Sequence, residues 1–325
     1  MTFRLRPLTL ALAVGVALAA PLSAKAQEYP TKPMKWVLGY GAGGASDVIA
    51  RTIARQLTDA LGQPVLIENR RGASGIIAAN YAAKSAPDGY TWLLVSSGFL
   101  VNIAMGRKMA FDPLKDFDAV TELGIVPNVV VVNPKSDIHS IKDLIAAAKA
   151  KPGELNFGSG GIGTGTHLAT EMFDKDAGIK MVHIPFKGTP PALTALMAGR
   201  IQVIFAGAPP ALPLVRSGKL RAIAVTSRKK SPVAPNLPPI SETVPGFDGV
   251  TWYALLVPHG TPKPIVGKLN ATFKKVLAEP SLQATLLKRG FVAESSTPAE
   301  AAKDMREKVD TYSKVIKEAG IRRVH

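Results

Sequence analysis

The chain of 325 residues contains no cysteine. This absence rules out disulfide bonds, a cysteine nucleophile and the thiol acceptor that a lipid anchor needs. We therefore expect stability to come from packed cores, and the chain is long enough for one large domain or two modest ones.

Aromatic residues are also scarce, at 6% of the chain, while 40 basic residues outnumber 24 acidic ones. The basic residues are scattered, and their longest run is Arg228-Lys229-Lys230. They do not alternate with aromatic side chains, as they do in surfaces that stack nucleic-acid bases. We therefore expect no nucleic-acid partner and interpret the net charge of +16 as a basic surface suited to a small anionic ligand.

Long apolar runs are absent except at the start of the chain, in Leu8–Leu22. Arg4 and Arg6 precede this run, and Ala24-Lys25-Ala26 follows it as an A-x-A cleavage site. The run is shorter than the roughly 20 residues that cross a bilayer. Residues 1–26 are thus predicted to be a cleavable signal peptide, which places the mature protein in the periplasm without a lipid anchor.

The remaining sequence alternates short β-rich runs with longer segments of helical periodicity, a pattern typical of parallel α/β sheets. Strands are expected at 35–40, 65–68, 91–96, 119–133 (in two pieces, because of Pro127), 155–158, 181–186, 202–206, 221–226 and 249–257. Helices are expected at 46–61, 75–86, 141–150, 166–177, 191–198, 210–217, 263–277, 282–289 and 298–318.

This alternation of strands and helices predicts two α/β units. The last helices have no strands of their own, so they need the apolar face of another sheet to cover. We expect them to return to the first unit. Lobe 1 would then comprise residues 27–124 and about 230–325, and lobe 2 would comprise about 125–229. The predicted fold is a two-lobed α/β protein of the type II periplasmic binding class. Each lobe would be a mixed, mostly parallel sheet flanked by helices, with a ligand cleft between the lobes.

The spacing G-x-G-x-x-G occurs twice, in Gly39–Gly44 and in Gly158–Gly163, each time between a strand and a helix. Glycine lets the backbone turn with positive φ and approach a ligand closely. The helix start that follows offers unpaired N–H donors and a partial positive charge. Two such loops at the carboxyl ends of strands would face each other across a cleft, as the two halves of an anion clamp.

The same spacing is also a fingerprint of dinucleotide binding. Glu68 lies where a ribose-binding acid is expected after the first loop, whereas the strand after the second loop ends in Phe186-Lys187. An NAD-dependent oxidoreductase is therefore an alternative, although nicotinamide cofactors are not freely available outside the cytoplasm. Two tight turns with no ligand are the third interpretation.

No catalytic constellation is present: the sequence contains neither G-x-S-x-G nor H-E-x-x-H. The histidines show no metal-ligand spacing; they are His139, His167, His183, His259 and His325. We therefore expect no enzymatic activity, no cofactor and no metal.

Two residues beside the glycine loops are interpreted as structural support. Asp47 is expected to cap N–H groups of the first loop, and His167 to bond local backbone at the second loop. His183 is expected to pack within its strand. Ser96 and Ser97 end a strand beside the presumed cleft, where they would donate hydroxyl bonds to a carboxylate or cap the next segment of the chain.

With these residues in view, the mature sequence closely resembles the Bug family, the periplasmic solute receptors of tripartite tricarboxylate transporters. The resemblance rests on ordered motifs along the chain: Tyr29-Pro30-x-Lys32-Pro33, Gly43-Gly44-x-x-Asp47, Leu61-Gly62-Gln63-Pro64-Val65, Glu68-Asn69-Arg70, Pro87-Asp88-Gly89-Tyr90-Thr91, Asp112-Pro113-Leu114-Lys115-Asp116-Phe117, His167-Leu168-Ala169, Pro185-Phe186-Lys187-Gly188, Gly218-Lys219-Leu220-Arg221-Ala222 and Gly260-Thr261-Pro262.

The resemblance implies a receptor that closes on a small carboxylate and hands it to the membrane subunits of a transporter. It also implies that backbone and hydroxyl groups from both lobes hold the ligand. The corresponding positions are Tyr40, Gly41, Ala42, Gly43, Gly44, Ala45, Ser46, Ser96, Ser97, Ser159, Gly160, Gly161, Gly163, Thr164, Thr166, Lys187, Gly188, Thr189, Gly207 and Ala208.

The first loop departs from the family pattern Pro-Phe-x-Pro-Gly-Gly, because Gly39 and Ala42 replace its two prolines. The loop should be more flexible, and Tyr40 adds a hydroxyl to the cleft wall. An aliphatic di- or tricarboxylate fits this pattern, and so does an aromatic acid stacked on Tyr40 or Phe186. A membrane sensor kinase is an alternative partner, and a monomer is expected.

Overall fold

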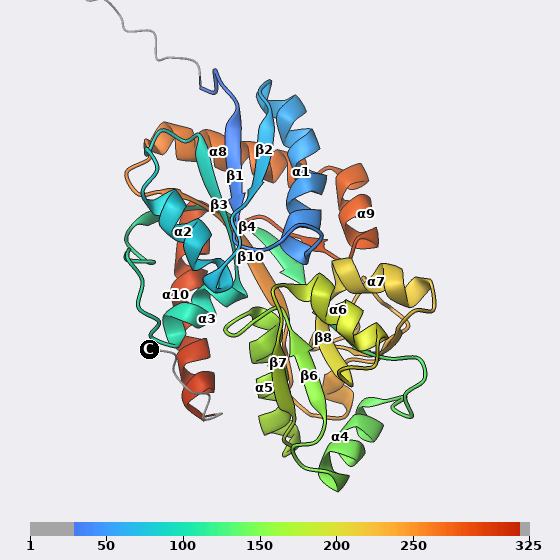
Figure 1. Ribbon diagram of the computed structural model, residues 1–325. Coiled ribbons are helices and arrows are strands. Elements are labelled where there is room, and N and C mark those ends of the chain that lie inside the picture. Colours follow the sequence, from blue (N-terminus) through green and yellow to red (C-terminus); the bar gives the residue numbers. More distant parts are fainter. Residues whose placement is uncertain (1–28, 319–325) are drawn as a thin grey trace, which may run out of the picture.

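The computed structural model describes residues 29–318, so the predicted signal peptide and His325 lie outside the described residues. Figure 1 shows two α/β lobes, one above the other, each built on its own sheet. Among residues 29–318, no helix is both long and apolar enough to cross a membrane.

Lobe 1 contains the six-stranded sheet and lobe 2 the five-stranded sheet. In spatial order, the sheet of lobe 1 consists of β11 (Val292–Ala293), β4 (Phe117–Val126), β10 (Thr251–Pro258), β3 (Thr91–Ser96), β1 (Met34–Leu38) and β2 (Val65–Asn69). The sheet of lobe 2 consists of β7 (Val182–Pro185), β6 (Asn156–Ser159), β8 (Val203–Gly207), β5 (Asn128–Val132) and β9 (Arg221–Val225).

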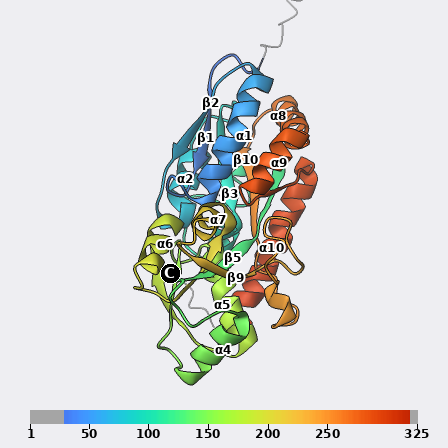
Figure 2. The same ribbon diagram turned by 90° about the vertical axis from the view of Figure 1, so that its right-hand side faces the viewer.

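Helices cover both faces of each sheet (Figure 2). In lobe 1 they are α1 (Ala45–Leu61), α8 (Lys263–Leu277) and α9 (Pro280–Lys288) on one face, and α2 (Ile76–Ala83), α3 (Ser97–Ala104) and α10 (Pro298–Glu318) on the other. In lobe 2 they are α6 (Thr189–Met197) and α7 (Ala208–Arg216) on one face, and α4 (Ile141–Ala150) and α5 (Gly165–Ala177) on the other. The short 3₁₀ turns are η1 (Ala73–Gly75) and η2 (Ile240–Glu242).

The chain passes between the lobes twice. Strand β4 ends at Val126 in lobe 1 and β5 begins at Asn128 in lobe 2, so Pro127 alone separates two strands of different sheets. Proline cannot donate a ladder hydrogen bond, which explains why the long β-rich run breaks there. The chain returns through residues 226–250, between β9 and β10.

Both sheets are mixed, as expected, but the expectation that they are mostly parallel is wrong: parallel pairing is confined to the groups β2-β1-β3 and β7-β6-β8. All other neighbours are antiparallel, including the pairs that the crossing strands β4, β5 and β10 make. The returning strand β10 lies in the middle of the lobe 1 sheet, between β3 and β4. The last helices therefore rest on the lobe that contains β10.

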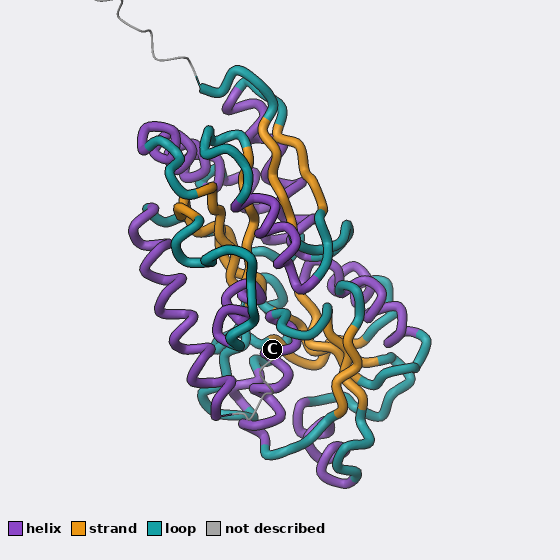
Figure 3. The backbone as a smooth tube through the Cα atoms, turned by 60° about the vertical axis from the view of Figure 1, so that its left-hand side comes forward, coloured by secondary structure: helices purple, strands orange, loops and turns teal. Residues whose placement is uncertain are grey.

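Helix α3 was not expected from the sequence. It begins at Ser97, directly after β3, and all its residues except Ile103 are buried. A helix that is apolar all round shows no amphipathic period. The long helix α10, which runs along one side of the lobe 1 sheet (Figure 3), packs on α3 and buries it. The last turn of α3 also contacts lobe 2, since Val101 and Ala104 pack with Leu168 of α5 and Ile316 of α10.

Three aromatic side chains, Trp36, Trp92 and Phe273, pack together in the lobe 1 core. All three side chains are fully buried, and the Phe273 ring meets the two indoles edge-on at centroid distances of 5.5 and 5.6 Å. Edge-to-face contacts of this kind add to the free energy of burial. Helix α8, which carries Phe273, is thereby fixed to the central strands β1 and β3.

Replacing Phe273 with alanine should lower the free energy of unfolding by about 3–5 kcal/mol, because it leaves a cavity between two buried indoles. The measurement is urea denaturation followed by tryptophan fluorescence. Leu66→Ala is the control, since Leu66 is 52% exposed and its loss should change stability by about 0.5 kcal/mol or less. Equal destabilisation by the two substitutions would contradict this description of the core.

Candidate functional site

A cavity of about 480 Å³ lies between the lobes. From lobe 1 it is lined by Tyr40, Gly41, Ala42, Gly44, Ala45, Ser46, Arg71, Ser96, Thr251 and Tyr253. From lobe 2 it is lined by Asn128, Gly160, Thr164, Gly165, Thr166, Lys187, Gly188, Thr189, Pro190, Pro191 and Gly207. Its size lies within the range of pockets that hold small molecules.

Five helices begin at this cavity. The first residues of α1, α5 and α6 line it, together with Ser96 and Gly207, which are the N-caps of α3 and α7. This convergence follows from topology, because each helix comes directly after the carboxyl end of a strand. Each helix start carries a partial positive charge of about half an elementary charge, so the cavity has a positive potential before any side chain is counted.

In the second glycine loop, most backbone N–H groups already have partners within the loop. The N–H of Gly160 donates to Thr166 Oγ1 (3.2 Å), that of Gly161 to Ser159 Oγ (3.0 Å), and that of Gly163 to His167 Nδ1 (3.3 Å). The first-turn N–H groups of Gly165 and Thr166 have no hydrogen-bond partner within the described chain. The N–H groups of the α5 start are therefore available to an anion on this side.

In the first glycine loop, the last two glycines before α1 also have partners within the loop or in the first turn of the helix. The N–H of Gly43 donates to Asp47 Oδ2 (3.0 Å), and that of Gly44 to the Gly41 carbonyl (3.3 Å). The N–H groups of Ala45 and Ser46, in the first turn of α1, have no partner among residues 29–318. Both lobes thus present free helix-start donors to one cavity.

The Asp47 carboxylate turns toward its own loop rather than into the cavity. It accepts the Gly43 N–H and a hydrogen bond of 2.9 Å from Arg51 Nε, one helical turn later. Burial of the carboxylate raises its pKa, but the bonds from Arg51 and Gly43 outweigh that effect and hold the Asp47 pKa below its usual value. Its negative charge is paired with Arg51 and with the Gly43 N–H, which is why it does not oppose an anion in the cavity.

The side chains of the lining carry positive charge and no negative charge. Arg71 of lobe 1 and Lys187 of lobe 2 are both exposed, and neither forms an ion pair within the described residues; no Asp or Glu lines the cavity. Glu68, the acid at the position expected for a ribose contact, instead pairs with Arg70 at 2.6 Å. The site is therefore suited to an anion, with one cation from each lobe.

Hydroxyl groups complete the lobe 1 wall. Ser96 Oγ lies 3.4 Å from Tyr40 Oη, which donates to the Ser74 carbonyl (3.3 Å). Burial raises the pKa of both the Tyr40 and the Tyr253 hydroxyl, so each remains a neutral donor near pH 7.

Fourteen of the twenty ligand-contact positions expected from the sequence line the cavity. The other six do not: Gly43, Ser97, Ser159, Gly161, Gly163 and Ala208. The three glycines shape the loops with positive φ, between 76° and 127°. Ser97 Oγ accepts the Trp252 N–H (2.9 Å), Ser159 meets His183, and the Ala208 N–H donates to the Pro127 carbonyl (3.2 Å).

Seven lining residues were missed in the sequence: Arg71, Asn128, Gly165, Pro190, Pro191, Thr251 and Tyr253. Thr251 and Tyr253 belong to β10, which returns from lobe 2 and enters the sheet beside β3. Asn128 is the first residue of β5 after Pro127. The polar residues Asn128 and Thr251, each directly after a crossing between the lobes, could have indicated these positions, because both crossings lead to the cavity.

The lobes also touch behind the cavity, where a short segment of lobe 1 meets the second glycine loop. Ser74 Oγ donates to the Ile162 carbonyl, and Ser74 and its neighbour Ala73 both have positive φ, 53° and 44°. Asn102 Nδ2 lies 3.4 Å from the Gly163 carbonyl. Left-handed conformations in non-glycine residues are costly, and here they bring Ser74 to the opposite lobe.

Comparison with known protein families decides the identity of this fold. Residues 49–321 match the family described as the tripartite tricarboxylate transporter family receptor. The chain belongs to this receptor family. The resemblance to Bug receptors is thereby confirmed, and so is the two-lobed α/β fold of a periplasmic binding protein.

Relatives of this receptor family match along almost the whole chain. BugT of Bordetella pertussis is 36% identical, covering 93% of this chain and 93% of BugT. Among solved structures, Rpa4515 of R. palustris with adipate superposes with a TM-score of 0.87 at 35% identity, covering 90% of this chain and 98% of that one. MatC of Rhodopseudomonas palustris with bound malate has a TM-score of 0.82 at 29% identity, covering 89% and 100%.

The contact between the lobes makes a testable prediction at Gly98, in the first turn of α3. A methyl group there would overlap the Tyr40 hydroxyl and lie 3.2 Å from both the Gly163 carbonyl oxygen and Thr164 Cα, across the lobe boundary. Overpacking costs about 1–3 kcal/mol, so Gly98→Ala should separate the lobes. Small-angle X-ray scattering should show a larger radius of gyration than for the native receptor.

The matched control is Gly267→Ala, because Gly267 also lies within a helix and a methyl group there meets nothing within 4 Å. It should leave the radius of gyration unchanged. An unchanged radius for Gly98→Ala as well would show that this contact does not hold the lobes together.

Proposed function

We propose that this chain captures a small carboxylate between its lobes and delivers it to the membrane subunits of a tripartite tricarboxylate transporter. The observation that carries the proposal is the convergence of five helix starts on a cavity lined by no acidic side chain. Free N–H donors at the starts of α1 and α5 supply the ligand contacts, with hydroxyls of Tyr40 and Ser96 beside them.

The ligand that fits best is a short diacid. One carboxylate would occupy the helix starts, and the second would lie between Arg71 and Lys187, which approach from opposite lobes. Two related structures hold adipate and malate, which are both dicarboxylates. The cavity volume of about 480 Å³ accommodates either.

We further propose that the lobes close on the ligand as rigid bodies. Residues 27–124 with about 230–325 would form one body, and about 125–229 the other, hinged at Pro127 and in 226–250. Support comes from the separate sheets and from the chain's passing between them at only two places in the described residues, Pro127 and 226–250. Closure would bring Lys187 and the α5 start onto a ligand already held by lobe 1.

Isothermal titration calorimetry of the mature protein tests the proposal with adipate, malate, citrate, benzoate, adipamide and NADH. One or more of the acids should bind with a Kd of about 1–10 µM, as three or four charge-assisted hydrogen bonds allow. The neutral adipamide should not bind. Binding of NADH in place of every acid would contradict the proposal and favour dinucleotide chemistry.

Substitution of the two cations tests the diacid assignment. Arg71→Ala and Lys187→Ala should each weaken adipate binding about tenfold, but should change binding of the monoacid hexanoate little, since a monoacid leaves the cation pair unused. Arg55→Ala and Lys219→Ala remove exposed charges elsewhere and serve as controls. Equal losses for adipate and hexanoate would contradict the assignment.

Delivery to the transporter needs a cellular measurement. Deletion of the gene should abolish uptake of the radiolabelled acid that binds best, and a copy of the gene should restore uptake. Undiminished uptake in the deletion strain would contradict a transport role.

A further inference from the structure

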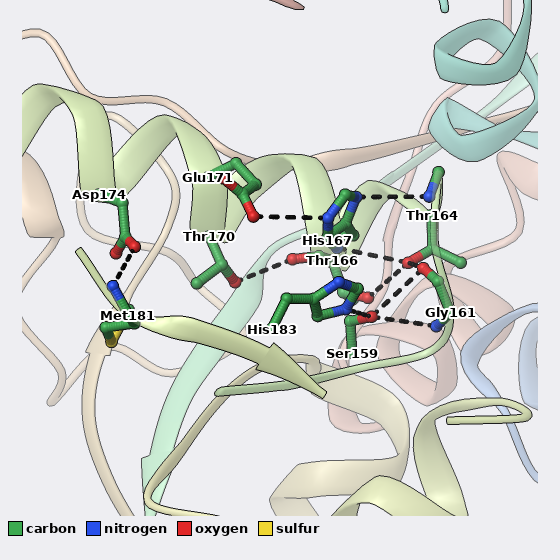
Figure 4. Close-up of polar contacts among 11 residues, drawn as sticks. Ser159, Gly161, Thr164, Thr166, His167, Thr170, Glu171, Asp174, Met181 and His183 are labelled. Carbon is green, nitrogen blue, oxygen red and sulfur yellow. Dashed lines mark hydrogen bonds and ion pairs between the residues drawn. The ribbon is translucent and has the colours of Figure 1, made fainter. Parts of the chain in front are cut away.

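Two histidines of lobe 2 lie stacked directly behind the second glycine loop (Figure 4). The rings of His167, in α5, and His183, in β7, have centroids 4.1 Å apart at an angle of 30°. Phe157 of β6 packs against His183 at 4.8 Å. Neither histidine lines the cavity, so neither is a ligand contact.

Each imidazole fixes one N–H group of the glycine loop. His167 Nδ1 accepts the Gly163 N–H directly (3.3 Å). Ser159 Oγ accepts the Gly161 N–H (3.0 Å) and lies 2.6 Å from His183 Nε2, which can take the hydroxyl proton. The Gly163 contact requires a ring nitrogen with a free lone pair, and hence a neutral His167 imidazole. In the Ser159–His183 contact either group can donate, because the Ser159 hydroxyl can also donate to the Gly161 carbonyl (3.2 Å).

The other nitrogen of His167 fixes its tautomer. His167 Nε2 lies 3.5 Å from Glu171 Oε1, one turn along α5. The neutral ring therefore carries its proton on Nε2 and leaves Nδ1 as the acceptor for Gly163. A second proton would sit on Nδ1 and face the Gly163 N–H, so that two donors would oppose each other.

We propose that the His167–His183 pair holds the second glycine loop, and with it the first turn of α5, in the ligand-binding arrangement only while the His167 ring is neutral. This inference rests on the proposed function for its effect on the ligand. Acidification would place a proton on His167, release the Gly163 N–H and weaken the carboxylate site at the start of α5.

The surroundings determine which ring takes the proton. Burial, and then the proximity of His167, lowers the pKa of His183 to about 3, so His183 stays neutral in the physiological range. The Glu171 carboxylate, in contrast, lies 3.5 Å from His167 Nε2 and can form an ion pair with a protonated His167. The proton is therefore assigned to His167.

Other charged groups face this cluster from the neighbouring elements. Asp174 of α5 accepts the Met181 N–H (2.7 Å), and burial raises its pKa to about 7. Arg107, after α3, reaches Gly163 through Asn102 (3.0 Å), and α10 contributes Glu318, which pairs with Lys175 of α5 at 3.0 Å. Strands β6 and β8 and helix α6 contain no titratable side chain. Asp174 therefore titrates within the pH range of the experiments below and needs its own control.

The first experiment uses the ligand-free protein. ¹⁵N NMR of the imidazoles should show His167 as the Nε2-protonated tautomer at pH 7.5 and as the cation at pH 5.0, with His183 neutral at both. Exchange of the Gly163 amide, corrected for intrinsic rates, should accelerate about tenfold or more over this range, because its acceptor is lost. A cationic His167 with unchanged Gly163 protection would overturn the proposal.

The second experiment measures adipate binding by calorimetry at pH 7.5 and 5.0. His167→Asn places an amide oxygen near the Nδ1 position and cannot take a proton, so it keeps the acceptor. Between the two pH values the native protein should lose about tenfold more affinity than His167→Asn, because a protonated imidazole offers the Gly163 N–H no acceptor whereas the amide oxygen still does. Titration of adipate itself is common to both proteins and cancels in this comparison.

Three further variants separate the alternatives. His167→Phe, which has no acceptor, should bind more weakly than His167→Asn at pH 7.5. His139→Asn, at an exposed histidine of lobe 2, should behave as the native protein at both pH values. Asp174→Asn should retain the native pH dependence; if it alone abolishes that dependence, Asp174 and not His167 is the titrating group and the proposal is wrong.

Failure of adipate to bind at any pH would contradict the proposed ligand class and leave the histidine proposal to be decided by the amide-exchange measurement. Equal pH dependence in the native protein and His167→Asn would overturn the histidine proposal while leaving the receptor function intact.

Discussion

The structure depends on one electrostatic constraint: five helix starts from two sheets meet at one cavity. Parallel strands bring the starts of α1, α5 and α6 to the cleft, and the N-caps of α3 and α7 lie beside them. Aligned dipoles of this kind favour an anion, and an acidic side chain in the lining would compete with a ligand for the helix starts. The lining contains no acidic side chain, and the Asp47 carboxylate is bonded to Arg51 and Gly43, so the helix starts are left to a ligand.

The glycines at 43, 160, 161 and 163 set the geometry of the two loops, and their N–H groups are not free to bind a ligand. Their N–H groups at Gly43, Gly160, Gly161 and Gly163 are occupied by side chains of Asp47, Thr166, Ser159 and His167. Because these partners hold the loops, the first turns of α1 and α5 keep their own N–H groups free. The two glycine loops thus support the helix ends. The residues behind the loops matter as much for ligand binding as those that face the cavity.

Much of this arrangement is present in the sequence because it is local. The alternation of strands and helices, the break at Pro127 and the two glycine turns each depend on neighbouring residues, so periodicity and glycine spacing reveal them. Helix α3 was not predicted from the sequence, because it is apolar on nearly every side and shows no amphipathic period. Tyr253 was not predicted as a lining residue. It reaches the cavity from β10, more than 200 residues after Tyr40 in the chain, and no local pattern encodes the pairing of β10 with β3. Which N–H groups are free also depends on side-chain partners such as His167 and Ser159. The spacing of the glycines does not predict these hydrogen bonds.

Backbone amide shifts test most directly the claim that helix starts from both lobes hold the ligand. Adipate, or the acid that binds best, is added to ¹⁵N-labelled mature protein. The account predicts large downfield proton shifts for the amides of Ala45, Ser46, Gly165 and Thr166, because these N–H groups gain a charged acceptor. Large shifts confined to the glycines at 160, 161 and 163, or to one lobe alone, would contradict it.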